Sequence, residues 1–183
     1  MSKQTDLLNL TDAITANGTA LKVDTIQTAA GGVPTASDLG INVAGSVLQV
    51  VQGVNGAEAA FAGTGGACGA SVTITPTSAT SKILVLVNLD GITVSVDAAG
   101  YGRFILSRNS TSISFFGYPR NWTSVDNASG TTMSTTYLDS PATTSALTYS
   151  TSWAPMNGTV TLQINRDGAS YSKSTITVME VAG

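Results

Sequence analysis

Leu147-Thr-Tyr-Ser-Thr-Ser-Trp153 begins the part of the sequence that decides the fold, which continues through Gly158-Thr-Val-Thr-Leu-Gln-Ile-Asn165 to Ser174-Thr-Ile-Thr-Val-Met-Glu-Val181. In all three runs apolar residues alternate with Thr, Ser, Gln or Asn. A period of two places the apolar side chains on one face of a strand and the polar ones on the other, which is typical of half-buried antiparallel sheet. The chain therefore ends in a β-domain.

Apolar runs of similar length recur upstream, between segments rich in turn-forming residues. The upstream runs predicted as strands are 45–52, 71–76, 82–90, 101–108, 112–117 and 131–138, and the Gly-rich segment 53–69 is predicted as a loop. Strands of roughly 5–8 residues without helices between them exclude a parallel βαβ topology, because parallel strands need crossover connections. The sequence predicts an all-β fold, an antiparallel two-sheet sandwich of jelly-roll type (45–183) preceded by an extended N-terminal arm (1–44).

The composition favours strands and disfavours a nucleic-acid partner. Charged residues make up only 10% of the chain, and Gly accounts for 19 of its 183 residues. The formal net charge is −3, and the eight Lys and Arg residues are spread thinly along the sequence. Because nucleic-acid binding needs a clustered basic surface, we expect no nucleic-acid partner.

Residue types that carry catalysis are scarce. The chain has no histidine and a single cysteine, Cys68, which excludes Ser-His-Asp catalysis and the usual zinc sites. The candidate carboxylates fall at predicted strand ends and in loops, where Asp is ordinarily a turn residue; they are Asp90, Asp97, Asp126, Asp139 and Asp167. We therefore expect no enzymatic activity, no cofactor and no metal site.

The run Lys82-Ile-Leu-Val-Leu-Val-Asn-Leu-Asp90 is apolar on both faces. A strand of this kind has to be covered on each side, so we expect a central strand between the core and a subunit interface. The residues predicted to form a trimer interface are Ile83, Val85, Val87 and Leu89.

The arm contains one alternating segment, Leu21-Lys-Val-Asp-Thr-Ile-Gln27. It carries too little apolar surface to fold alone, so we expect Leu21, Val23 and Ile26 to anchor the chain on a partner. That partner is either another copy of the chain or another protein.

The segment 118–130 is predicted as a long loop with aromatic residues. Its Tyr118, Arg120 and Trp122 either pack as ordinary surface residues or face a receptor, stacking on a sugar and hydrogen-bonding to it. The pattern leaves open whether Trp122 is buried or displayed.

Nothing in the sequence predicts membrane insertion. No run approaches the roughly 20 apolar residues of a membrane span, and the N-terminus lacks the basic and apolar regions of a signal peptide. We expect synthesis in a cytoplasm. If the protein acts outside the cell, it would then have to leave the cell by a route other than secretion, such as release inside an assembled particle.

Two segments resemble virion proteins of tailed bacteriophages, especially those of marine and cyanobacterial phages. Leu21-Lys-Val-Asp-Thr-Ile-Gln-Thr-Ala-Ala-Gly-Gly-Val-Pro34 with Gly45-Ser-Val-Leu-Gln-Val-Val-Gln52 is similar to the arm and first strand of tail fibres. The stretch from Tyr137-Leu-Asp-Ser-Pro141 to Val181 resembles the C-terminal β-domain of the same group. The resemblance implies a compact trimeric jelly roll of the tumour-necrosis-factor and complement-C1q type, an arm docked to the particle, and no enzymatic activity.

The resulting hypothesis is a homotrimeric virion structural protein, synthesised in the host cytoplasm. Residues 1–44 would bind other virion proteins, and domain 45–183 would contact a host-surface glycan or protein as a short tail fibre or tail-tip adhesin. The alternative is a capsid decoration or cement protein on the head surface. An enzyme such as a glycan depolymerase is a third hypothesis, which the missing histidine and the unpaired carboxylates disfavour.

Overall fold

The computed structural model describes residues 44–96, 100–119, 131–157, 160–166 and 172–183. By its internal contacts the chain divides into two units, Met1–Asn42 and Val43–Gly183, and the described residues all belong to the second. Leu21, Val23 and Ile26 of the predicted arm therefore lie outside the described residues.

The described residues form strands and no helix. In chain order the strands are β1 (Val47–Asn55), β2 (Ala59–Ala62), β3 (Gly66–Ile74), β4 (Lys82–Val96), β5 (Tyr101–Arg108), β6 (Thr111–Phe116), β7 (Thr131–Asp139), β8 (Leu147–Asn157), β9 (Val160–Ile164) and β10 (Ser174–Val181).

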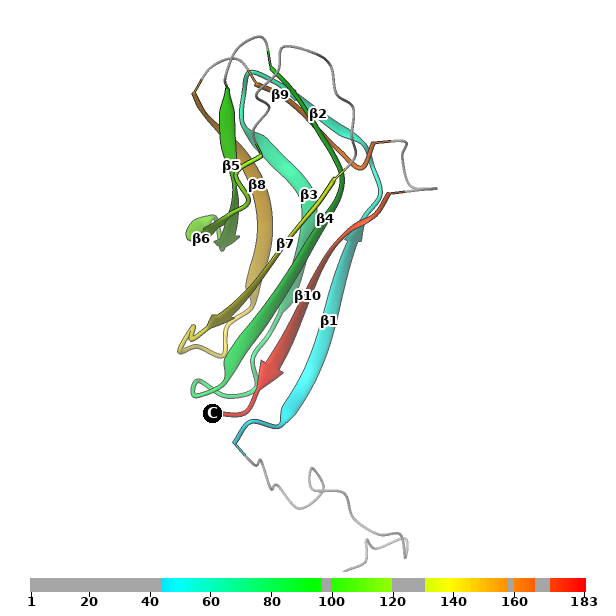
Figure 1. Cartoon of the computed structure of the whole chain (residues 1–183). Helices are drawn as coiled ribbons and strands as arrows, with labels where there is room; N and C mark the ends of the chain where they lie inside the picture. Colours follow the sequence, from blue (N-terminus) through cyan, green and yellow to red (C-terminus); the bar gives the residue numbers. More distant parts are fainter. Residues whose placement is uncertain (1–43, 97–99, 120–130, 158–159, 167–171) are drawn as a thin grey trace, which may run out of the picture. The chain divides into compact units, whose positions relative to one another are not determined.

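The strands build two antiparallel sheets that face each other as a sandwich (Figure 1). One sheet has the order β1-β10-β4-β9-β2, with β7 also paired to β4, and the other has the order β3-β8-β5-β6. With β2 and β9 set aside, the first sheet holds the first, eighth, third and sixth strands of the chain, β1-β10-β4-β7. The second sheet holds the second, seventh, fourth and fifth. This is the strand order of a jelly roll, so the predicted fold class is confirmed.

The predicted loop 53–69 is wrong in part. It contains β2 and the start of β3, and β2 pairs with β9 from Ala59↔Ile164 to Ala62↔Thr161. The segment is rich in Ala and Gly and shows little apolar alternation, so its extended conformation depends on the pairing that β9 offers.

The long strand β4 changes partners along its length. Its first part pairs with β10 and β7, and its last residues, Thr93 to Val96, pair with β9. The register with β7 shifts between Leu89 and Ile92, around Gly91, which has a φ of 58°. A side chain at Gly91 would be strained by that φ and would lie 2.8 Å from the backbone nitrogen of Arg166. A glycine at this bulge thus lets one strand serve both parts of the sheet.

The core lies between the two sheets and is built from the alternating inward residues of both. Its largest members are Trp153, Tyr149 and Phe104, all at most 1% exposed. The ring of Phe104 lies 5.2 Å from that of Trp153 and 5.7 Å from that of Phe116, measured between centroids. These aromatic residues come from three neighbouring strands of the same sheet and fix its inner face.

The strands predicted over 101–108 and 112–117 are present as the hairpin of β5 and β6. Asn109 and Ser110 join the two strands with φ values of 46° and 67°, the left-handed conformation that a tight hairpin turn requires. The backbone nitrogen of Asn109 donates to the carbonyl of Thr148, and its side-chain oxygen accepts from the backbone nitrogen of Thr148, both at 2.8 Å. The turn is therefore tied to β8 as well.

Candidate interaction surfaces

The structure corrects the predicted trimer interface. The four predicted residues are between 0% and 2% exposed in a single chain and belong to its core; they are Ile83, Val85, Val87 and Leu89. They leave no surface for another subunit, because they already pack between the two sheets. The face of β4 that is still partly accessible is the opposite one, which carries Leu84 and Leu86.

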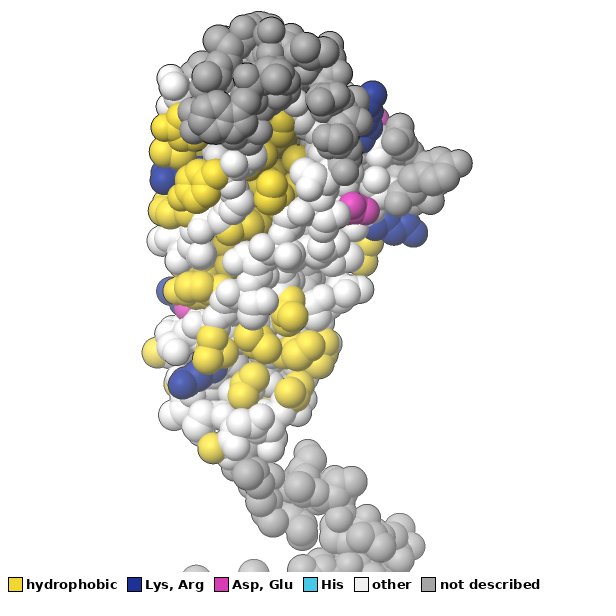
Figure 2. Space-filling model, in the orientation of Figure 1, with side chains coloured by type: hydrophobic (Ala, Val, Ile, Leu, Met, Phe, Trp, Pro, Cys, Tyr) yellow, Lys and Arg dark blue, Asp and Glu magenta, His cyan; other side chains and the backbone are white. Residues whose placement is uncertain are grey.

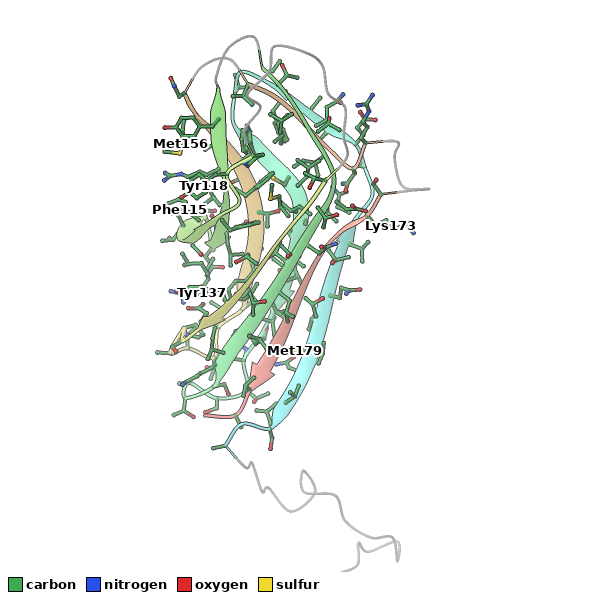
Figure 3. The ribbon with its side chains drawn as sticks, viewed as in Figure 1. Phe115, Tyr118, Tyr137, Met156, Lys173 and Met179 are labelled. Atoms are coloured by element: carbon green, nitrogen blue, oxygen red, sulfur yellow. The ribbon has the colours of Figure 1, made fainter. Side chains whose placement is uncertain are left out.

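A row of apolar residues that includes Leu84 crosses the outer face of the first sheet. Val50 pairs with Met179, Met179 with Leu84, and Leu84 with Leu138, so the row crosses β1, β10, β4 and β7. Val50 and Leu138 are 55% and 52% exposed. Figure 2 shows apolar side chains gathered over this part of the sheet, around Met179, which Figure 3 labels. We call these four residues the outer apolar row.

The sandwich carries a second exposed apolar group on the other sheet. Phe115 of β6, Met156 of β8 and Tyr118 are 45%, 47% and 56% exposed, and Figure 3 shows the three on the same side of the molecule. The guanidinium carbon of Arg103 lies 3.8 Å from the centroid of the Phe115 ring, within the range of a cation–π interaction. We call Arg103, Phe115, Tyr118 and Met156 the aromatic cluster.

The structure therefore places one of the three predicted loop residues on the surface. Tyr118 is exposed, whereas Arg120 and Trp122 lie outside the described residues. Sequence reasoning missed Arg103, Phe115 and Met156 as neighbours of this site. The pairing of β5 with β6 and β8 brings them together, and the only local signal was Phe115 next to the buried Phe116.

Asp139 anchors a polar network between the sheets. Its carboxylate accepts hydrogen bonds from Arg108 of β5 at 2.7 and 2.8 Å and from the hydroxyl of Tyr149 of β8 at 2.6 Å. The hydrogen bond to Asp139 raises the pKa of Arg108, and burial, with the hydrogen bond to Asp139, raises the pKa of Tyr149. The phenol therefore remains a donor, and the network joins β7 of one sheet to β5 and β8 of the other.

Glu180 of β10 is fully buried and accepts hydrogen bonds on both carboxylate oxygens. Oε1 accepts from the backbone nitrogen and the hydroxyl of Thr77 at 2.7 and 2.8 Å, and Oε2 accepts from the side chain of Gln49 at 2.5 Å. Burial opposes ionisation, but these hydrogen bonds outweigh it and lower the pKa of Glu180 from 4.5 to about 2. The carboxylate is thus a structural acceptor that joins β10, β1 and the segment after β3.

The remaining candidate for chemistry is the thiol of Cys68. It is fully buried in β3, and burial raises its pKa to about 12. Among the described residues, no three His, Cys, Asp or Glu side chains are grouped so that they could hold a metal ion. In the same residues there is no helix long and apolar enough to cross a membrane.

Comparisons with known proteins found no matching family model and no matching curated protein. Among solved structures, the chain is similar to dimeric latent PorU from Porphyromonas gingivalis, with 9% identity, a TM-score of 0.44 and 77% of this chain covered. It is also similar to the infectious bursal disease virus VP2 subviral particle, with 14% identity, a TM-score of 0.29 and 75% of this chain covered. The matched regions span 13% and 38% of those two chains. The function of this protein therefore rests on its own residues.

Proposed function

We propose that this chain is a non-enzymatic structural protein of a phage particle, a short tail fibre or tail-tip adhesin that assembles with copies of itself as a homotrimer. Residues 1–44 attach it to other virion proteins, and domain 45–183 contacts the host surface. The aromatic cluster is the observation that carries the adhesin role. The resemblance of the sequence to tail-fibre proteins is the reason for proposing that the chain belongs to a phage particle.

The aromatic cluster suits a saccharide that bears an acidic group. Phe115 and Tyr118 expose flat aromatic surfaces, which stack on the C–H faces of sugar rings, and the Tyr118 hydroxyl can also hydrogen-bond. Within the described residues no carboxylate pairs with Arg103, whose guanidinium is held against Phe115. A planar guanidinium in that position can bind a carboxylate or phosphate on two oxygens. An acidic host-surface glycan is therefore the ligand class that we propose.

The buried carboxylates support a structural role for the domain. Asp139 is bonded to Arg108 and Tyr149, and Glu180 is bonded to Gln49 and Thr77. A general acid or nucleophile needs a carboxyl oxygen that can reach a substrate. The oxygens of these two residues point instead at protein donors inside the sandwich.

The test combines location with adsorption. Immunogold microscopy with an antibody to the chain should label the tail of the particle, and purified full-length protein should compete with particles for host cells. The variant Phe115→Ala/Tyr118→Ala should compete at least tenfold less well, because both stacking surfaces are removed. Thr73→Ala, an exposed residue of β3 in the same sheet, is the matched control and should compete like the wild type.

A capsid decoration protein is the second candidate, because the outer apolar row offers a surface that could lie on a shell. In that case gold particles should cover the head, and the purified chain should not compete for host cells. Removal of the protein should then lower the temperature at which the capsid releases its genome. Labelling of the tail together with competition rejects this candidate.

A further inference from the structure

The outer face of β1-β10-β4-β7 has the anatomy of a protein interface. The outer apolar row forms its centre, and Leu86, Val47 and Val181 extend the apolar surface on either side. The next rows carry no charge and are mostly polar. Gln52, Thr177 and Thr136 flank Leu86, and the row after that holds Thr175, Asn88 and Ser134 beside the exposed Val54. Most antiparallel sheets with one free face present polar residues there, so a continuous apolar row is a departure from the usual pattern.

Charged side chains stand only at the two ends of this face, as far as the described residues go. Lys82 begins β4 at one end, and Asp90 and Lys173 lie at the other. Figure 3 shows Lys173 well away from Met179, which belongs to the outer apolar row. Depletion of charge at the centre with a polar rim is the composition that distinguishes an interface from ordinary protein surface.

We infer that this face is where copies of the chain meet, with the outer apolar row of one copy against that of the next. The inference rests on the proposed self-association and names a contact surface for it. Because equivalent residues face each other, this contact has two-fold symmetry and joins copies in pairs, whereas a trimer joins two different surfaces of the chain. A second copy fits because an uncharged face meets its own equivalent without repulsion, even though each chain carries a net charge of −3. The Thr, Ser, Gln and Asn side chains beside the row can both donate and accept, so they can pair with their own equivalents.

The area of the face is sufficient for such a contact. Four strands about 4.8 Å apart, each contributing about eight residues at about 3.3 Å per residue, give a face of roughly 500 Å². Two such faces packed about 10 Å apart would bury on the order of 1,000 Å² in total, the lower limit for a specific interface. An acidic or basic partner, in contrast, would find no opposite charge at the centre of this surface.

The test is the mass of the full-length protein in solution, measured by sedimentation velocity over a range of concentrations. The wild type should sediment as an oligomer, and Val50→Lys/Leu138→Lys should associate at least tenfold more weakly and approach the 18.5 kDa monomer. Both residues are more than half exposed, so the folded chain should tolerate the lysines. Thr73→Lys/Ser112→Lys, at exposed positions of β3 and β6 in the other sheet, adds the same charge and should keep the wild-type mass.

A wild type that stays monomeric, or a Val50→Lys/Leu138→Lys variant that keeps the wild-type mass, overturns the inference. If the double lysine variant fails to fold, Leu138→Cys supplies a second measurement. Its thiols should form a disulfide between copies at a rate that falls on dilution, and the absence of this product counts against the contact. Cys68 does not interfere, because it is buried.

The two proposals can fail separately. If the wild type is an oligomer that dissociates on mutation of the outer apolar row but does not compete for host cells, the interface is supported and the adhesin role is rejected. If the wild type is a monomer that competes for host cells, the adhesin role is supported and this interface is rejected.

Discussion

Replacing Glu180 by Gln tests the view that this carboxylate is a structural acceptor. Gln has the same shape but presents one oxygen and one NH2 group. If its oxygen takes the two hydrogen bonds from Thr77, its NH2 group faces the side-chain nitrogen of Gln49, so that donor meets donor. Gln49 cannot rotate its amide without a cost, because the same nitrogen also donates to the carbonyl of Thr75 at 2.7 Å.

The size of the effect follows from the pKa of Glu180. Each pKa unit corresponds to about 1.4 kcal/mol, so the difference between 4.5 and about 2 amounts to about 3 kcal/mol of stability at neutral pH. Because the folded pKa lies below the unfolded value, this contribution is fully present well above pH 4.5. It is lost as the pH falls through the range from about 4.5 to about 2.

The assay is urea unfolding of wild type and Glu180→Gln between pH 7 and pH 2, followed by the fluorescence of the buried Trp153. At pH 7 we expect the variant to be less stable by about 2–3 kcal/mol, the range for a hydrogen-bonded charged group. The difference in the free energy of unfolding should shrink steadily below about pH 4.5. The pH dependence that the other carboxylates contribute cancels in this difference, because both proteins contain them. A difference below about 0.5 kcal/mol at pH 7, or one that does not depend on pH, would refute the assignment.

Three further predictions concern the core and its polar network. Tyr149→Phe removes a 2.6 Å hydrogen bond to the Asp139 carboxylate and should lower the free energy of unfolding by about 1.5–3 kcal/mol in the same urea assay; no loss would mean that the hydroxyl has another role. Val85→Asp buries an unpaired charge, so it should abolish the folded domain by circular dichroism, and a soluble, folded monomer would contradict the placement of Val85 in the core. The pKa of Cys68, about 12, leaves roughly a thousandfold less thiolate than the ordinary pKa of 9.0 would, so a disulfide reagent should react with this thiol only on unfolding. Rapid labelling of the folded protein would contradict its burial.

Local patterns were sufficient to predict the sandwich. The alternation in Leu147–Trp153, Val160–Ile164 and Ser174–Val181 is a property of consecutive residues, and it survives in the burial patterns of β8, β9 and β10. The missed strand β2 has only four residues, and its extended form depends on β9, which lies a hundred residues away along the chain. A strand that owes its conformation to a distant partner leaves little trace in its own sequence.

The candidate surfaces were harder to predict because their residues are gathered by pairing. In β4 both faces are apolar, so the sequence alone cannot decide between Val85 and Leu84 as the inward residue. The choice is made by register, since a shift of one residue would exchange the two faces of the strand. Tyr118 was found because an exposed tyrosine in a predicted loop is visible from sequence, whereas Arg103 belongs to its site only through the pairing of β5 with β6.

The outer apolar row depends on three independent registers at once. Val50 faces Met179 only if β1 and β10 pair as they do, and two more pairings bring in Leu84 and Leu138. A slip of two residues in the β1–β10 or the β4–β7 pairing would keep every core residue inward but would set an apolar residue of the row beside a polar one, as Leu86 is now beside Thr177 and Thr136. Burial in the single chain therefore does not by itself require the row to be aligned. Contact with another copy does require it, because a broken row would leave apolar side chains of each subunit against polar groups of its neighbour.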